Sequence, residues 1–272
     1  KWAARNRLTK SNREPGNKTL YFVDIFANWF DPDLAKCLVA VLKHHGISVF
    51  VPGEQQWSTS SAIAEGDIEY ARSIARRNVT MLAEAVRQGY TIVTTEPTAA
   101  MCLTQEYPNL LGDDDAQLVA ENTQDACHYL WGLHEGGKLE LDLQPVNYQV
   151  GYHLPCHLRA LAKFTPGEHL LQLIPGLTVH RIEKGCSGMA GTFGLQKKNY
   201  RNSLRSGWGL ISTMRDSVIQ VGTTECSACK IQMEQGTTKP TLHPIKLLAH
   251  AYRLAPQVSQ QLAQPSRDLT TS

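Results

Sequence analysis

The chain has 272 residues, of which 42% are hydrophobic and 19% are charged, and its formal net charge is +2. This length is enough for one large domain or two of ordinary size, and no apolar run reaches the roughly 18 residues that a membrane-spanning helix needs. Seven cysteines, an odd number, argue against a secreted disulfide framework and favour a reducing compartment, where clustered cysteines indicate metal binding or catalysis.

The two ends of the chain differ in composition from the middle. Residues 1–18 are rich in Lys and Arg, and we interpret them as a basic linker because no interleaved aromatic side chains suggest nucleic-acid binding. The chain starts at Lys1 without an apolar signal-peptide region, so we expect a segment of a longer protein. Residues 256–272 are polar and repeat Gln and Ser, which predicts a disordered tail.

Strands and helices alternate between these ends. Apolar runs predict strands at 19–27, 47–51, 90–95, 149–153, 177–182 and 217–222. Helical spacing and cap residues predict helices at 32–45, 61–88, 97–107, 113–134, 156–163, 200–215, after Cys226, and at 243–253. This alternation predicts parallel βα units and therefore an α/β fold.

The pattern restarts in the second half of the chain. At a shift of 129 residues, Thr-Thr-Glu at 223–225 meets Thr-Thr-Glu at 94–96, each at the end of a predicted strand. We therefore expect two tandem parallel βα repeats, 19–135 and 149–255, joined by a linker at 136–148. We expect the repeats to be related by pseudo-twofold symmetry, with sites at the C-terminal ends of the strands.

Four cysteines of the second repeat each follow a predicted strand: Cys156, Cys186, Cys226 and Cys229. Parallel sheets collect their sites at the carboxyl ends of the strands, so we expect these thiols to meet there. One Cys-x-x-Cys pair with two distant cysteines favours an iron–sulfur cluster over zinc, because structural zinc sites usually pair two short knuckles. Zinc and unligated cysteines are the alternatives.

The first repeat lacks these cysteines. The shift of 129 places Ala27, Trp57, Pro97 and Ala100 at the equivalent positions. We expect Trp57 to fill the space that a cluster takes in the second repeat, and therefore one cluster in the chain. The remaining cysteines lie among apolar neighbours on predicted helices and are expected in the core. They are Cys37, Cys102 and Cys127.

The motifs around the four cysteines resemble the cysteine-rich CCG domain. They are YHLPCHL at 152–158, CSGMAG at 186–191 and CSAC at 226–229. This family occurs in heterodisulfide reductase and in the iron–sulfur subunits of glycolate oxidase and anaerobic glycerol-3-phosphate dehydrogenase, usually as two tandem copies. The chain also resembles the C-terminal part of fused proteins that have an FAD-linked oxidase domain followed by ferredoxin-type clusters.

The resemblance implies the iron–sulfur part of an FAD-linked oxidoreductase of the 2-hydroxy-acid dehydrogenase type, without turnover of its own. It implies one [4Fe–4S] cluster on the four cysteines, and FAD and ferredoxin-type clusters on upstream domains or partner subunits. It also implies a cytoplasmic location or a peripheral one at the cytoplasmic membrane face, next to a membrane electron acceptor. No nucleic-acid partner is expected.

Ser187 stands where the family pattern has a second cysteine. In the heterodisulfide reductase type, five cysteines hold a non-cubane cluster, so four thiolates favour the ordinary cubane and leave the non-cubane form as the alternative. Candidates for an extra ligand or for hydrogen bonds to the cluster are Ser187, His153 and His157. The alternative functions are a heterodisulfide-reductase-like catalytic cluster domain and a zinc-binding or structural interaction module.

Basic residues follow the glycine-rich turn that contains Cys186. Lys197, Lys198, Arg201 and Arg205 could balance the charge of a cluster or guide a redox partner. A solvated helix face is the preferred interpretation.

Overall fold

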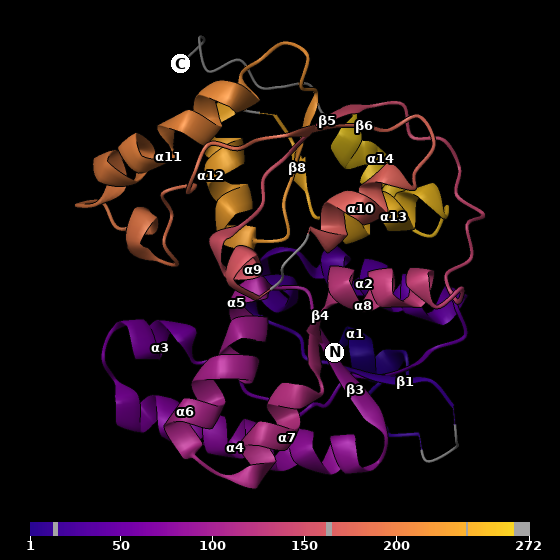
Figure 1. The fold of residues 1–272 in the computed structure, drawn as a ribbon, viewed down its shortest axis with the longest axis vertical. Helices are drawn as coiled ribbons and strands as arrows, with labels where there is room; N and C mark the ends of the chain where they lie inside the picture. The colour runs from indigo at the N-terminus through magenta and orange to yellow at the C-terminus, as the bar shows by residue number, and fades with distance from the viewer. Residues whose placement is uncertain (13–15, 162–164, 238, 264–272) are drawn as a thin grey trace. The chain divides into compact units, whose positions relative to one another are not determined.

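The computed structural model describes residues 1–12, 16–161, 165–237 and 239–263, and the chain divides into two compact units (Figure 1). Unit 1 comprises Lys1–Leu139 and unit 2 comprises Glu140–Ser272. Each unit has its own four-stranded sheet, and the paired strands in both sheets are parallel. In the described part of the chain, no helix is both long and apolar enough to cross a bilayer.

The sheet of unit 1 has the strand order β2-β1-β3-β4. Its strands are β1 (Lys18–Tyr21), β2 (Ser48–Phe50), β3 (Tyr90–Thr94) and β4 (Thr123–Asp125). Four of the five residues of β3 are buried, as expected for a strand that is covered on both faces of its sheet. Because all four strands are parallel, their carboxyl ends meet at one edge of the sheet.

The helices of unit 1 connect these strands. They are α1 (Trp2–Arg5), the π-helix η1 (Phe26–Phe30), α2 (Pro32–His44), α3 (Ser60–Ala64), α4 (Ile68–Arg87), α5 (Pro97–Met101), the π-helix η2 (Cys102–Glu106), α6 (Tyr107–Leu111), α7 (Asp114–Glu121) and α8 (Ala126–Glu135). Aspartate side chains cap the N-termini of two of these helices. Asp113 accepts a hydrogen bond from the N–H of Ala116 at the start of α7, and Asp125 accepts one from the N–H of Cys127 at the start of α8. The long helix α4 packs against α6 and α7, so these three helices enclose one apolar core with the sheet.

Unit 2 repeats this plan with the strand order β6-β5-β7-β8. Its strands are β5 (Gln149–Tyr152), β6 (Thr178–Arg181), β7 (Val221–Thr223) and β8 (Thr241–Leu242). Its helices are α9 (Cys156–Leu161), α10 (Pro166–Gln172), the short 3₁₀ turn η3 (Phe193–Leu195), α11 (Tyr200–Met214), α12 (Ser227–Thr237), α13 (Pro244–Ala251) and α14 (Pro256–Leu262). The matching strand orders confirm the predicted α/β fold of two tandem parallel repeats.

Strand register corrects one detail of the predicted alignment. Tyr152 pairs with Thr223, whereas the partner of Tyr21 is Val93, so the residue equivalent to Tyr152 is Phe22. The shift between the repeats is therefore 130 in the first strand of each unit, although 129 holds for β3 and β7. The counterpart of Cys156 in unit 1 is then Phe26 and not Ala27.

Several predicted boundaries also differ from the structure. The predicted helix at 113–134 is two helices, α7 and α8, separated by strand β4, which is too short and polar to stand out as a strand. The predicted tail at 256–272 begins with helix α14, whose Val258 and Leu262 are buried. Residues 264–272 of that tail lie outside the described residues.

Both segments predicted as linkers make specific contacts within their units. In the basic segment 1–18, Leu8 is buried and its carbonyl accepts a hydrogen bond from the N–H of Val51 at 2.8 Å. In the segment 136–148, the N–H of Val146 donates to the carbonyl of Pro175 at 2.8 Å. Leu8 and Val146 therefore pack within unit 1 and unit 2, respectively.

Candidate metal centre

The four predicted ligands follow three strands that are neighbours in the sheet of unit 2. Cys156 is the first residue of α9, after β5, and Cys186 lies in the loop after β6. Cys226 follows β7 immediately before α12, and Cys229 lies in the first turn of that helix. Because the strands are parallel, all four cysteines belong to the carboxyl edge of one sheet, where sites of α/β folds collect.

Cys156 lies close enough to two of the other thiols to interact with each of them. The side chains of Cys156 and Cys186 share a hydrogen bond, and Cys226 adds an electrostatic effect at Cys156. This hydrogen bond is the main cause that lowers the pKa of Cys186 to about 5, and the N–H of Gly188, 3.3 Å from the Cys186 sulfur, acts in the same direction. The same shared proton raises the pKa of Cys156. The hydrogen bonds to Cys186 therefore favour the thiolate on this sulfur.

Cys226 and Cys229 form the inner side of the group. Both are buried, in an apolar cluster with Met189 and Ala228, whereas Cys156 and Cys186 are exposed. Both lie at the start of α12, where the helix dipole favours a negatively charged sulfur. Two of the four thiols are therefore buried, and the other two are exposed to solvent.

The Cys186 loop is held against helix α11 by direct backbone contact. Gly188 has a φ of +84°, and a Cβ there would lie 2.1 Å from the carbonyl oxygen of Ser203. On the helix, a Cβ at Gly207 would lie 2.1 Å from the carbonyl oxygen of Ser187. Both glycines are thus required for this close approach. A glycine inside a predicted helix is a signal that could have pointed to Gly207.

Ser187 and His153 are two buried residues near the Cys186 sulfur. Ser187 is buried, and its side chain adds a hydrogen bond that favours the Cys186 thiolate. His153 is also buried, and desolvation lowers its pKa to about 4, against the opposing effect of Cys186. A neutral His153 near Cys186 can donate or accept a hydrogen bond. His157 is half-buried on α9.

This donor set fits an iron–sulfur cluster. Four thiols from one sheet edge are the ligands that such clusters take, and backbone N–H groups and a neutral histidine beside them are typical surroundings. The glycine-rich loop adds space at the open side, because Gly185 and Gly191 have nothing within 4 Å of a built Cβ. The other three cysteines, Cys37, Cys102 and Cys127, are buried in helices of unit 1, as predicted.

The equivalent edge of unit 1 carries no thiol at the positions aligned with the four cysteines. Pro97 and Ala100 are buried there, and Trp57 is half-buried with its ring centroid 6.3 Å from that of Tyr70. Ser58 donates to the buried carboxylate of Asp24 at 3.2 Å. That Trp57 fills the volume of a cluster stays a prediction.

Comparison with known families identifies the cysteine-bearing repeat. Residues 150–234 match the family described as CCG: Cysteine-rich domain, and this match covers all four cysteines. Within unit 2, these residues are therefore a CCG cysteine-rich domain.

Similarity to individual proteins extends over both units. The chain is 34% identical over 236 residues to a subunit of anaerobic glycerol-3-phosphate dehydrogenase of Escherichia coli (strain K12), covering 86% of this chain and 59% of that protein. It is 27% identical over 240 residues to a subunit of fumarate reductase (CoM/CoB) of Methanothermobacter marburgensis, covering 87% and 45%. It is 25% identical over 227 residues to a subunit of dihydromethanophenazine:CoB–CoM heterodisulfide reductase of Methanosarcina barkeri, covering 80% and 53%. The chain thus spans about half the length of these relatives, which are all named as parts of oxidoreductases.

Proposed function

We propose that Cys156, Cys186, Cys226 and Cys229 hold one [4Fe–4S] cluster and that the chain passes electrons within a larger oxidoreductase. The observation that carries this proposal is the arrival of four thiols at one sheet edge, with Cys156 hydrogen-bonded to Cys186. The relatives support the class, because their names describe parts of dehydrogenases and reductases. When bound, the cluster supplies one-electron transfer.

Each part of the site has a role in this proposal. The hydrogen bonds to Cys186 favour its thiolate, which is the form that ligates a metal. The buried pair, Cys226 and Cys229, excludes water from the inner side. Cys156 and Cys186 form the exposed side, through which a redox partner can approach.

We favour the cubane cluster over the non-cubane form. Ser187 stands beside Cys186 where the CCG pattern has a second cysteine, and a serine hydroxyl at this buried position is a hydrogen-bond donor in place of a fifth thiolate. His153 lies near enough to Cys186 to feel its charge, and desolvation lowers the pKa of His153 to about 4, which favours the neutral ring. In this proposal both residues tune the cluster and do not ligate it.

The central test is metal content. The chain is purified without oxygen, reconstituted with iron and sulfide, and assayed for iron, sulfide and zinc, and the reduced protein is examined by electron paramagnetic resonance. We expect about four iron and four sulfide per chain. Cys226→Ala should lose most of the iron, whereas the control Cys37→Ala, which removes a core cysteine, should keep it. Zinc in place of iron, or full iron content in Cys226→Ala, would contradict the proposal.

We propose further that the electrons come from a flavin-bearing domain or subunit that oxidises a small hydroxylated substrate, of the 2-hydroxy-acid or glycerol-3-phosphate kind. The names of the relatives support the presence of partner subunits, because each relative is named as one subunit of an oxidoreductase. The test is purification of the native complex, followed by flavin analysis and assay with 2-hydroxy acids and glycerol 3-phosphate. A complex that contains the cluster but no flavin contradicts this part alone.

A further inference from the structure

Helix α11 of unit 2 carries a row of side chains that is covered on the equivalent helix of unit 1. Helices α4 and α11 correspond at the shift of 129, because Asn78 and its counterpart Gly207 both contact the loop after the second strand. On α4, one row at intervals of four residues is fully buried: Ala71, Ala75, Val79 and Ala83. The same row of α11 is exposed or half-buried: Tyr200, Leu204, Trp208 and Ser212.

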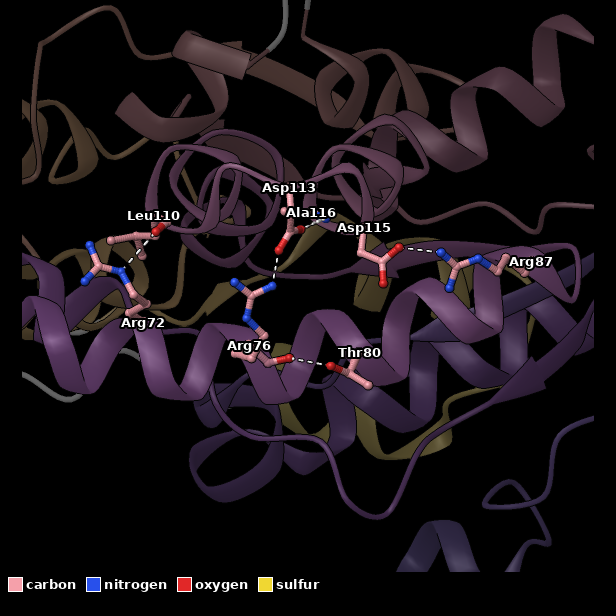
Figure 2. A network of polar contacts seen from close by, with 8 residues as sticks. All are labelled: Arg72, Arg76, Thr80, Arg87, Leu110, Asp113, Asp115 and Ala116. Carbon is pink, nitrogen blue, oxygen red and sulfur yellow. Dashed lines mark hydrogen bonds and ion pairs between the residues drawn. The ribbon is translucent and has the colours of Figure 1, made fainter.

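In unit 1 the cover is provided by α6 and α7. Val79 of α4 belongs to the same apolar cluster as Ala116 and Val119 of α7. Beside this apolar contact, polar groups of the covering segment pair with arginines of α4 (Figure 2). Arg76 forms an ion pair with Asp113, the N-terminal cap of α7, and Arg72 donates to the carbonyl of Leu110 at 3.1 Å.

Unit 2 keeps the arginines, but its described residues include no helix that covers them as α7 covers α4. Arg201 and Arg205 of α11 stand at the positions of Arg72 and Arg76, and both are exposed. The connection that supplies α6 and α7 in unit 1 runs through 95–122, between β3 and β4, whereas its counterpart in unit 2 is only 224–240. In its described residues, that shorter connection contains α12 and no helix equivalent to α7.

We propose that the α11 outer face, formed by Tyr200, Arg201, Leu204, Arg205 and Trp208, is a docking surface for an acidic helical segment of a partner protein. The partner helix packs on α11 as α7 packs on α4. An acidic residue at the start of this helix forms an ion pair with Arg205, and one of its apolar side chains packs against Trp208. We infer an acidic partner from unit 1, where Arg76, the residue equivalent to Arg205, forms an ion pair with Asp113. A large aromatic residue and arginines on one exposed face are also typical of interface anchors.

The position of the face relates the proposal to the candidate metal centre. The residue before Trp208 is Gly207, which contacts the Cys186 loop. A partner on the α11 outer face therefore contacts the helix that carries this loop. The proposal does not depend on a bound cluster. It rests on the observation that a row of side chains is buried on α4 and exposed or half-buried on α11.

The test uses a probe copied from unit 1. A fluorescein-labelled peptide with the sequence of residues 107–121, which contains α6 and α7, is titrated with the full chain at low salt and followed by anisotropy. We expect saturable binding that weakens about tenfold in Arg201→Glu/Arg205→Glu, because charge reversal replaces attraction by repulsion. Trp208→Ala should also weaken binding. The control Arg77→Glu reverses an exposed charge on α4 and should leave binding unchanged.

Charge exchange makes the test specific. A peptide with Asp113→Arg should bind Arg205→Glu more tightly than it binds the unaltered chain. Absence of saturable peptide binding, or equal binding by Arg201→Glu/Arg205→Glu, overturns the proposal. So does binding to phosphatidylserine vesicles that is stronger than peptide binding and is lost in the same variant, since the face then serves a membrane. Self-association that Trp208→Ala abolishes overturns it in favour of a second copy of this chain.

Discussion

The two units hold the loop after their second strand in different ways. In unit 1 the side chain of Asn78 bridges loop and helix: its oxygen accepts from the N–H of Gln56 at 2.8 Å, and its amide nitrogen donates to the carbonyl of Trp57 at 3.3 Å. In unit 2 the equivalent helix position is Gly207, and the backbone of the loop touches the helix directly at Ser187. A side chain thus separates helix and loop in one repeat and is absent in the other.

This difference coincides with the loss or presence of the thiols. Direct backbone contact fixes the position of the Cys186 loop without any rotatable side chain, which suits a ligand that must stay in place. In unit 1, the loop carries Trp57 in place of Cys186, and its neighbour Ser58 hydrogen-bonds to Asp24. The comparison indicates that the closeness of the loop to the helix is a property of the cysteine-bearing repeat and not of the fold as such.

The largest effect is expected from a methyl group at the contact in unit 2. Gly207→Ala places a Cβ 2.1 Å from the carbonyl oxygen of Ser187, so the loop or the helix must shift. We expect a loss of about 3 kcal/mol in the free energy of unfolding, measured in urea, as for other overpacked sites. We also expect a reduced iron content after reconstitution, because Cys186 moves with the loop.

The matched control is the same substitution in a helix of unit 1. Gly132 lies inside α8, and a Cβ there has nothing within 4 Å. Gly132→Ala should therefore stabilise the chain by about 0.5–1 kcal/mol through helix propensity. Equal effects of the two substitutions would show that the close approach in unit 2 has no energetic role.

A smaller effect is expected from removal of the bridge in unit 1. Asn78 is almost fully buried, and its amide also donates to the hydroxyl of Tyr107 at 2.9 Å. Asn78→Ala removes all three hydrogen bonds, so we expect a loss of roughly 2 kcal/mol in unfolding free energy. Iron content should not change. The control Asn202→Ala, at an exposed position of α11, should stay within about 0.5 kcal/mol of the unaltered chain, and an equal loss there would argue against the bridge.

Much of the fold is encoded in local patterns that sequence alone reveals. Buried strands such as β3 are continuous apolar runs, and the repeated Thr-Thr-Glu after β3 and β7 predicts the tandem arrangement. Strand β4 was missed because its three residues, Thr123–Asp125, are polar and lie between two helices. The shift of 130 in the first strand is a matter of register, which only strand pairing determines.

The sequence predicts which residues form the candidate site but not what surrounds them. The spacing of Cys226 and Cys229, with Cys156 and Cys186 each after a strand, was enough to predict one group of thiols. The roles of Gly207 and Asn78 were not predicted, because each depends on a contact between a loop and a helix that lie far apart in the sequence. Which thiol carries the negative charge likewise depends on the hydrogen bonds of the folded loop.

The smallest expected effect is a difference in stability between alanine variants of two equivalent arginines, one on α4 and one on α11. Arg76 is paired with Asp113 in a half-exposed contact, whereas its counterpart Arg205 is exposed. Arg76→Ala should lower the free energy of unfolding by about 0.5 kcal/mol at low salt, and less at high salt, because exposed ion pairs are weak and screened. Arg205→Ala should leave stability unchanged at either salt concentration, since no segment of unit 2 covers it in the described structure. Urea unfolding of both variants at two salt concentrations measures the difference, and a salt-dependent loss in Arg205→Ala would mean that its face is already covered within the chain.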